Sequence, residues 1–176
     1  MTGDVTPPRA GIEVHPVRPA ECAEAGRATR AGFAALFGET DHEYLDMVGD
    51  IAGRLDRTTV LVAIEEGRVL GSVTLELTAK VDPERELAPD EAHLRMLGVS
   101  PEAQGRGAGR ALVEAAAALA QAAGKRRLTL GTLPEMRAAR RLYEVMGFQS
   151  GPPRERAPGE HLLTYELVLT PSPSAP

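Results

Sequence analysis

A short segment rich in glycine and arginine carries the clearest sign of chemistry in this sequence. It reads Gln104-Gly105-Arg106-Gly107-Ala108-Gly109-Arg110 and lies between a predicted strand and a predicted helix. Glycines let the main chain approach an anion closely, and the unpaired N–H groups at a helix N-terminus attract phosphate. Arg106 and Arg110 add positive charge at the same place. The segment therefore predicts a phosphate-binding turn.

Two other glycine-rich phosphate motifs do not fit this segment. A Walker A loop ends in Gly-Lys-Ser/Thr, whereas this segment ends in Gly-Arg-Ala. A dinucleotide-binding fingerprint requires an acidic residue about 20 residues further on, at the end of the next strand, and the strand predicted at 126–130 contains no acid. The remaining alternative is a tight strand–helix turn without a ligand, which needs neither three glycines nor two arginines.

The spacing of the apolar residues predicts the elements that position this turn. Strands are expected at 12–17, 58–64, 69–77, 92–99, 126–130, in a short stretch opening at Phe148, and at 161–169, with helices at 20–37, 41–55, 107–123 and 134–146. A hairpin in the first half and strand–helix alternation in the second predict an α/β fold, a central mixed sheet flanked by helices, in the order β-α-α-β-β-β-α-β-α-β-β. One domain is expected at 11–169, with disordered tails at 1–10 and 170–176.

The composition argues against several classes of function. The 176 residues carry a net charge of −5, which argues against a general nucleic-acid binder. No apolar run approaches the roughly 18–20 residues that span a bilayer, and residues 1–11 lack the apolar region of a secretory signal, so we expect no membrane association. Cys22 is the only cysteine, so an intrachain disulfide is impossible and a cytoplasmic location is expected. The four histidines lie far apart in the sequence, so no metal site is expected.

Three segments between residues 92 and 150 together form a recognisable pattern. They read Leu94-Arg95-Met96-Leu97-Gly98-Val99-Ser100-Pro101, then Gln104-x-x-Gly107-x-Gly109, then Ala139-x-x-Leu142-Tyr143-Glu144-x-x-Gly147-Phe148. The middle segment resembles the Gln/Arg-x-x-Gly-x-Gly/Ala signature of the GNAT (Gcn5-related N-acetyltransferase) superfamily, and the others resemble the strand before that signature and a later family segment. The resemblance implies an acyl-CoA-dependent N-acyltransferase, and the predicted order of elements fits that family.

The resemblance implies acetyl-CoA as co-substrate. Backbone groups of Leu97, Gly98 and Val99 would pair with the pantetheine amides, as an added strand pairs with a sheet edge. The glycine-rich turn would hold the pyrophosphate. The residues implied for the cofactor are Leu97, Gly98, Val99, Gln104, Gly105, Arg106, Gly107, Ala108, Gly109, Arg110, Met136, Ala139 and Tyr143. Many relatives carry Asn at the position of Met136, so an apolar contact is expected there instead.

Acyl transfer to an amine requires removal of a proton from the amine, a site for the oxyanion and a proton for the leaving thiolate. Tyr143 fits the family's general acid, since a phenol can protonate a nascent thiolate. His93 stands where histone-acetylating relatives carry a Glu base, and histidine titrates near neutral pH. Glu91 and Glu76 are reserve bases, and an amine of low pKa needs no dedicated base. The oxyanion is expected at the backbone N–H of Val99 or a neighbour.

The structural alternatives for these residues are simple. Tyr143 could be a core tyrosine packed by its ring, and His93 a partly buried histidine with a structural hydrogen bond. Unbroken alternation along the strand at 92–99 would place His93, Arg95, Leu97 and Val99 on one face, toward the cofactor cleft.

The sequence constrains the acceptor only weakly. Acidic clusters at 39–50 and 82–91 fall in segments that, by the resemblance, border the acceptor side, and they would draw a cationic amine. A polyamine, an aminoglycoside, an amino acid, a protein N-terminus or a lysine all fit. The alternative function is a non-catalytic module that senses acyl-CoA, which the missing Asn and Glu leave open. Self-association is common in the family, and the last strand at 161–169 could pair across a homodimer.

Overall fold

The computed structural model describes residues 11–78 and 86–170. Two of the predicted features, the tail at 1–10 and residues 171–176 of the other tail, lie outside these residues, as do Asp82 and Glu84 of the second acidic cluster. The chain forms two compact units, one made of the residues up to Leu75 with Met96–Ala116, and one made of Glu76–Arg95 with the residues from Ala117 onward. That residues 11–169 act as a single domain stays a prediction.

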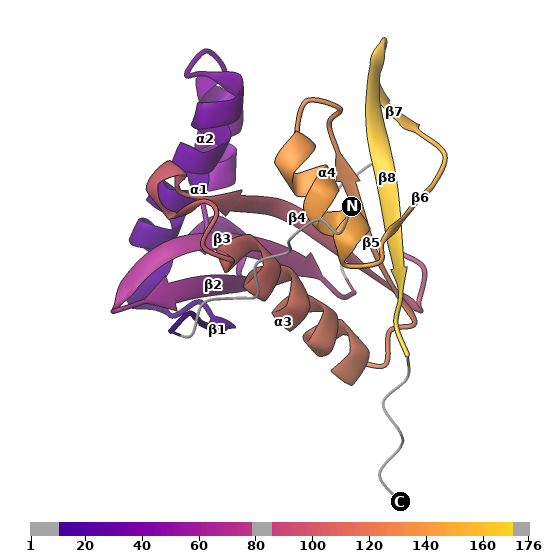
Figure 1. Ribbon diagram of the computed structural model, residues 1–176, viewed down its shortest axis with the longest axis horizontal. Coiled ribbons are helices and arrows are strands. Elements are labelled where there is room, and N and C mark those ends of the chain that lie inside the picture. Colours follow the sequence, from indigo (N-terminus) through magenta and orange to yellow (C-terminus); the bar gives the residue numbers. More distant parts are fainter. Residues whose placement is uncertain (1–10, 79–85, 171–176) are drawn as a thin grey trace, which may run out of the picture. The chain divides into compact units, whose positions relative to one another are not determined.

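Three consecutive strands of the sheet pair antiparallel in the first unit (Figure 1). β1 (Glu13–Pro16) pairs with β2 (Thr59–Glu65), and β2 pairs with β3 (Arg68–Glu76). Glu66 and Gly67 close the β2–β3 hairpin with φ values of 51° and 77°. Two left-handed residues in a two-residue turn match the twist of the flanking strands, so the turn fixes their register.

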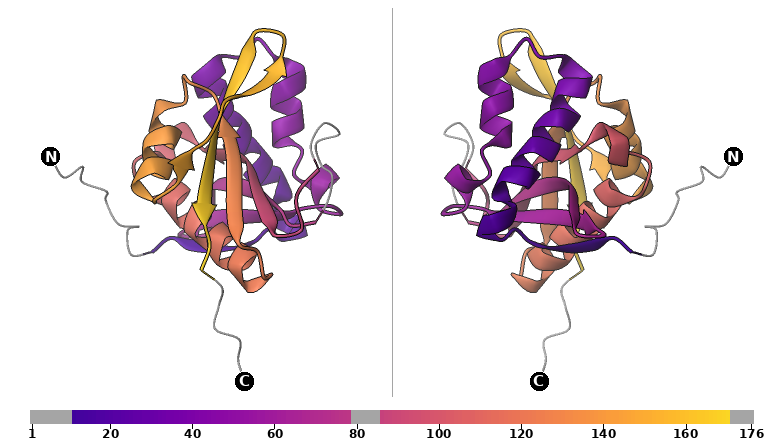
Figure 2. Two further views of the ribbon diagram at one scale, coloured as in Figure 1. Left: turned by 90° about the vertical axis from the view of Figure 1, so that its right-hand side faces the viewer. Right: turned by 90° about the vertical axis from the view of Figure 1, so that its left-hand side faces the viewer.

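Two helices, α1 (Cys22–Phe37) and α2 (His42–Gly49), pack against each other in the first unit, as Figure 2 shows. A 3₁₀ turn η1 (Pro19–Glu21) precedes α1, and Gly38, with φ of 77°, caps its C-terminus. The Asp41 carboxylate accepts a hydrogen bond from the Tyr44 N–H at 3.0 Å, so it caps the N-terminus of α2.

Helix α2 ends at Gly49, earlier than the predicted residue 55, and the reason is local capping. Asp50 leaves the helical conformation with ψ of 80°, and a 3₁₀ turn η2 (Ala52–Arg54) follows. The buried Arg54 side chain donates to the carbonyls of Met47, Val48 and Asp50, which satisfies the acceptors exposed at the helix end.

Strand β4 (Glu91–Val99) and helix α3 (Ala108–Ala122) each contribute residues to both units, with a 3₁₀ turn η3 (Pro101–Ala103) between them. In the first unit, the Ser100 N–H donates to the Leu70 carbonyl at 2.9 Å. The left-handed conformation of Met96, with φ of 52°, interrupts the extended backbone of β4.

The second unit is built around β5 (Arg127–Thr132), which pairs in parallel with the start of β4 and antiparallel with β8 (Glu160–Val168). The short strands β6 (Gln149–Ser150) and β7 (Arg154–Ala157) also pair with β8, and the β7–β8 hairpin is visible in Figure 2. Strand β7 was not predicted, because its residues are polar and largely exposed.

Helix α4 (Arg137–Val145) begins later than the predicted residue 134. Residues 133–136 instead form a turn in which the Met136 N–H donates to the Leu133 carbonyl at 3.0 Å. Parallel and antiparallel pairing in one chain, with helices alongside, is the mixed α/β fold predicted from the sequence, a central mixed sheet flanked by helices.

Candidate active site

The glycine-rich turn has the backbone conformation that its sequence predicts. Gly105 and Gly107 have φ values of 74° and 91°, in the left-handed region where side chains are strained. A Cβ added to Gly105 would meet nothing within 4 Å, so the conformation and not lack of space requires glycine there. Helix α3 begins directly after the turn, and the Ala111 N–H donates to the Gly107 carbonyl at 3.0 Å. The N–H groups of the three helical residues before Ala111 have no carbonyl one turn earlier in the helix, which is the arrangement that binds anions.

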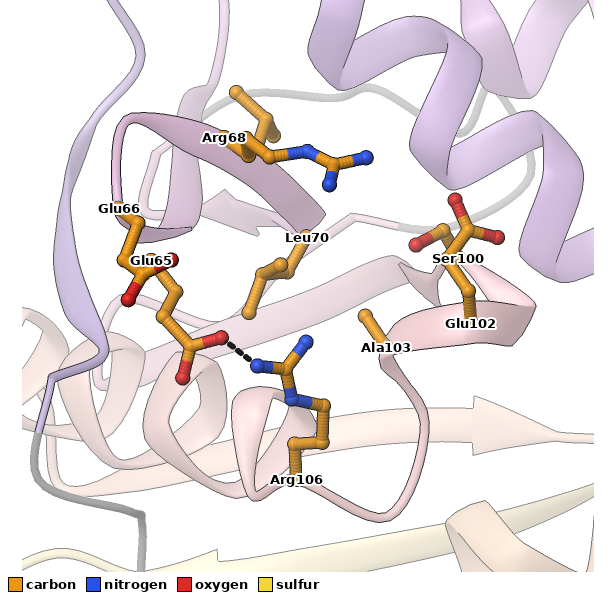
Figure 3. A pocket seen from close by; sticks show the side chains of 9 residues that line it. Glu65, Glu66, Arg68, Leu70, Ser100, Glu102, Ala103 and Arg106 are labelled. Carbon is orange, nitrogen blue, oxygen red and sulfur yellow. Dashed lines mark hydrogen bonds and ion pairs between the residues drawn. The ribbon is translucent and has the colours of Figure 1, made fainter.

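Carboxylates hold both arginines of this turn. Arg106 forms an ion pair with Glu65 at the end of β2, and the Arg110 Nε donates to Glu114 at 2.7 Å, one helical turn further on (Figure 3 shows the first pair). Gln104 points to the end of β4, because its Nε2 donates to the Val99 carbonyl at 3.3 Å. The three long side chains thus stabilise the turn itself.

A cavity of about 160 Å³ lies beside Arg106 in the first unit (Figure 3). Its walls combine acidic, basic and apolar side chains, namely Glu65, Glu66, Arg68, Val69, Leu70, Ser100, Glu102, Ala103 and Arg106. Pockets that enclose a drug-sized ligand measure roughly 300–1,000 Å³. The cavity therefore has room for a group of phosphate size and not for a whole nucleotide.

The end of β4, predicted to contact pantetheine, is fixed by close backbone packing in the first unit. A Cβ on Gly98 would lie 2.8 Å from Thr29 atoms, and a Cβ on Gly32 would lie 2.6 Å from the Val99 carbonyl oxygen. Distances under 3.0 Å are not tolerated without movement, so glycine at these positions lets α1 approach this end of the strand.

Met96 corrects one of the sequence predictions. The expectation that His93, Arg95, Leu97 and Val99 share one face assumed unbroken alternation along the strand. A left-handed residue at 96 ends that alternation, so the argument holds only as far as Arg95. Such conformations are costly for a side chain as large as methionine and concentrate near functional sites.

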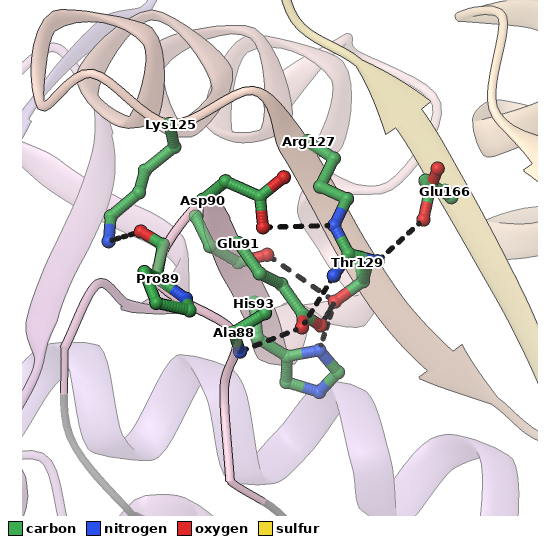
Figure 4. A network of polar contacts seen from close by, with 10 residues as sticks. Ala88, Pro89, Asp90, Glu91, His93, Lys125, Arg127, Thr129 and Glu166 are labelled. Carbon is green, nitrogen blue, oxygen red and sulfur yellow. Dashed lines mark hydrogen bonds and ion pairs between the residues drawn. The ribbon is translucent and has the colours of Figure 1, made fainter.

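His93 belongs to a hydrogen-bonded network within the second unit (Figure 4). In the parallel register, Glu91 lies opposite Arg127 and His93 lies opposite Thr129. The His93 Nδ1 is 2.8 Å from the Thr129 Oγ1, and the same hydroxyl donates to the buried Glu91 carboxylate at 2.6 Å. His93 is thus connected to a carboxylate through one threonine.

Arg127 lies among three carboxylates, at 3.5 Å from Asp90, 3.6 Å from Glu91 and 3.2 Å from Glu166 (Figure 4). Burial alone lowers the pKa of Arg127, but the hydrogen bond to Glu166 and the charges of Glu91 and Asp90 outweigh it and raise that pKa above its ordinary value. The guanidinium therefore stays charged and offsets the buried charge of Glu91.

The two reserve bases are both engaged by arginines. Glu91 is 3% exposed and also accepts a hydrogen bond from the Ala88 N–H at 3.3 Å. Glu76 is buried and pairs with Arg95 at 3.3 Å. A carboxylate paired with a cation is a weaker base than an unpaired one.

Tyr143 lies in an aromatic cluster of the second unit and is 5% exposed. Its ring centroid is 5.6 Å from that of Phe148 and 5.9 Å from that of Tyr165. Burial raises the pKa of the Tyr143 phenol well above its usual value, so the group stays protonated at neutral pH. Within the part of the chain that the structure describes, no hydrogen bond of this hydroxyl is found, whereas the Tyr165 hydroxyl donates to Glu144 at 2.9 Å.

The remaining cofactor candidates lie at the start of α4. Met136 is the residue before the helix, is partly buried, and accepts a hydrogen bond at its Sδ from the Thr132 hydroxyl at 3.4 Å. Ala139 lies in the first turn of α4 and is also partly buried.

Four of the five acids at 39–50 have structural roles. Glu39 and Asp46 form ion pairs with Arg30 at 3.0 and 3.6 Å. Asp41 caps α2, and Asp50 accepts a hydrogen bond from the Gly53 N–H at 3.0 Å. The cluster is therefore less available to a cationic acceptor than its composition suggests.

Sequence reasoning missed Thr129 and Arg127. Both residues are recognised only from the parallel register, which places Thr129 opposite His93 and Arg127 opposite Glu91. A single sequence does not reveal such a register. Among residues 11–78 and 86–170, no three His, Cys, Asp or Glu side chains group as a metal site would require. None of the helices described there has the length and apolar character to cross a bilayer.

The model of the acetyltransferase (GNAT) family matches residues 27–148 of the chain. Solved structures with a similar fold include an acetyltransferase of the GNAT family from Desulfovibrio desulfuricans, with 20% identity, coverage of 90% of this chain and 99% of that one, and a TM-score of 0.70. The acetyltransferase yncA from Salmonella typhimurium, solved with its cofactor acetyl-CoA, has 22% identity, coverage of 94% and 98%, and a TM-score of 0.64. The ribosomal-protein-S18-alanine N-acetyltransferase from Escherichia coli has 18% identity, coverage of 93% and 97%, and a TM-score of 0.66. No curated protein sequence matches the chain.

Proposed function

Because the chain belongs to the GNAT acetyltransferase family, we propose that it transfers the acetyl group of acetyl-CoA to a primary amine of a small molecule or protein, by direct attack in a ternary complex. The observation that carries the proposal is the network of His93, Thr129 and Glu91, since an ammonium group must lose a proton before it can attack. An imidazole titrates near neutral pH, which suits that task.

Acetyl-CoA would bind along the residues that the sequence predicts. The left-handed glycines and the first turn of α3 would bind the pyrophosphate through backbone N–H groups. Arg106 would exchange Glu65 for a phosphate oxygen, since a guanidinium can bind either anion. Two similar proteins, yncA and the PaiA N-acetyltransferase from Thermoplasma acidophilum, were solved with acetyl-CoA and coenzyme A respectively, which supports acetyl-CoA as the ligand.

The proposed reaction uses three groups of this chain. The amine attacks the thioester carbonyl carbon while His93 takes its proton, and the Val99 N–H stabilises the oxyanion. When the carbon–sulfur bond breaks, the electron pair goes to sulfur, and the Tyr143 hydroxyl donates its proton to the thiolate. The products are an amide and free coenzyme A. The His93 imidazolium then releases its proton to solvent, and a proton from solvent restores the Tyr143 phenol.

The acceptor is proposed only as a class. A cationic amine stays a hypothesis that rests on the acidic residues at 39–50, four of which also have structural partners. A cytoplasmic location and pairing of two copies through β8 likewise stay predictions.

The test combines binding and turnover on the full chain. Calorimetry measures binding of acetyl-CoA, and a thiol reagent measures release of coenzyme A against a panel of amines. We expect thiol release that depends on a particular amine. Binding of acetyl-CoA without release for any amine would instead favour the acyl-CoA sensor, and absence of binding would contradict both functions.

A further inference from the structure

We infer that Thr129 is a positioning residue, which determines the nitrogen of His93 that carries the proton and thereby the tautomer in which the imidazole acts as a base. The inference rests on the proposed role of His93 as a base and deepens it. Three side chains on neighbouring strands, Glu91, Thr129 and His93, carry the argument (Figure 4).

The hydrogen-bonding capacity of a threonine hydroxyl determines the direction of this network. A hydroxyl has one hydrogen to donate and two lone pairs that accept. The Thr129 Oγ1 is 2.6 Å from a Glu91 carboxylate oxygen and 3.3 Å from the Ala92 carbonyl oxygen. An ionised carboxylate and a carbonyl only accept, so the single hydrogen of Thr129 is used by one of these two partners.

The third partner of Thr129 must then be a donor. The His93 Nδ1 lies 2.8 Å from the hydroxyl oxygen, which can only accept from it. The Nδ1 therefore carries the proton, and in a neutral imidazole the Nε2 then holds the lone pair. The other tautomer would place the Nδ1 lone pair against a lone pair of the Thr129 oxygen, which is repulsive.

Polar partners and the strand register hold Glu91 and Thr129 in this network. The Arg127 guanidinium lies 3.6 Å from the Glu91 Oε2, and the Ala88 N–H donates to the same oxygen at 3.3 Å, whereas Thr129 contacts Oε1. Thr129 and Glu91 are both buried, which strengthens hydrogen bonds between them. The parallel register places His93 directly opposite Thr129, so the pairing of β4 with β5 holds the donor and the acceptor together.

Nuclear magnetic resonance tests the inference without any measurement of activity. The full chain is labelled with ¹⁵N-histidine and studied at a pH where the imidazole is neutral. Long-range correlations between ring nitrogens and ring protons then report which tautomer His93 adopts. We expect the Nδ1–H form in the wild type and in Thr129→Ser, which keeps the hydroxyl, and a shift toward the Nε2–H form in Thr129→Val. An Nε2–H form in the wild type, or an unchanged tautomer in Thr129→Val, would overturn the inference.

Kinetics provide the second readout. We expect Thr129→Val to lower kcat for amine acetylation about 10–100-fold, the range found when the hydrogen-bond partner of a functional histidine is removed. The KM for acetyl-CoA should stay within about twofold, because Thr129 acts on the base and not on cofactor binding. Thr129→Ser should recover most of the activity. When His93 is already replaced by alanine, Thr129→Val should lower kcat by less than about a further twofold, because the two residues act as one unit.

The two proposals fail in different ways. An equal loss from Thr129→Val with and without His93 contradicts the positioning role, although the enzyme still acetylates amines. The predicted change of tautomer in a protein that acetylates none of the amines supports the positioning role and contradicts the proposed function.

Discussion

Replacing Tyr143 by phenylalanine removes one oxygen and leaves the ring in place. The ring contacts with Phe148 and Tyr165, at 5.6 and 5.9 Å between centroids, do not involve the hydroxyl. Since no hydrogen bond of this hydroxyl is found among the described residues, its removal breaks none of the bonds seen there. We therefore expect the free energy of unfolding to change by less than about 1 kcal/mol, within the range of a single net hydrogen bond. For a chain of this size that limits the Tm change to about 2–4 °C.

The expected loss of activity is much larger. A general acid contributes roughly 10²–10⁴-fold to a rate, which corresponds to about 2.7–5.4 kcal/mol of activation free energy. The assay is single-turnover release of coenzyme A at saturating amine, because slow product release then cannot hide the chemical step. Thermal unfolding followed by circular dichroism provides the stability of the same variant.

A matched control lies in the same aromatic cluster. Tyr165→Phe also removes one hydroxyl, but that hydroxyl donates to Glu144 at 2.9 Å and has no proposed role in proton transfer. We expect it to lower stability by about 1 kcal/mol and the single-turnover rate by less than about threefold. If Tyr143→Phe keeps its rate within threefold, or if the two variants lose rate equally, Tyr143 is not the acid.

Three further predictions each concern the replacement of one residue. Gly105→Ala should lower the free energy of unfolding by about 1–2 kcal/mol, because alanine is strained at φ of 74°. Calorimetry should also show weaker binding of coenzyme A to this variant. An unchanged affinity would show that the turn does not contribute to the cofactor site. Arg54→Met should lower stability by about 3 kcal/mol because it removes the buried guanidinium that donates to the Val48 and Asp50 carbonyls. Urea unfolding should show the exposed control Arg57→Met within about 0.5 kcal/mol of the wild type. Burial raises the pKa of Tyr143 in the folded state, so the neutral phenol contributes fully to stability below the unfolded pKa of about 10, and this contribution is lost as the pH rises from there toward the folded pKa. Between pH 8 and 11, the free energy of unfolding should therefore fall less steeply for Tyr143→Phe than for the wild type. The same slope in both proteins would contradict the burial of this hydroxyl.

The sequence predicts the fold well where local signals are strong. Apolar periodicity places the long helices and the inner strands near their observed positions. The prediction from the sequence fails where an element depends on residues that are distant along the chain. Strand β7 has no apolar alternation and forms by pairing with β8, and the end of α2 depends on the carbonyls that Arg54 satisfies.

In the candidate site, too, the local features could be predicted from the sequence and the long-range contacts could not. Left-handed conformations at Gly105 and Gly107 follow from glycine content, because few other residues adopt them readily. The pair of Arg106 with Glu65 joins residues 41 positions apart, and the contact of His93 with Thr129 depends on strand register. Neither leaves a local pattern. The left-handed Met96 also lacks a signal, since its neighbours are typical of a strand.

The most direct test of the proposed function is transfer of a labelled acetyl group in a single turnover. The full chain is mixed with acetyl-CoA labelled in the acetyl group, with and without an amine from the panel, and the label is located by mass spectrometry. The account predicts that label appears on the amine in the same amount as coenzyme A is released, and that without amine neither release nor labelled protein is seen. Label on the protein in the absence of amine would contradict direct attack, and label that reaches no amine despite bound acetyl-CoA would contradict the acetyltransferase itself.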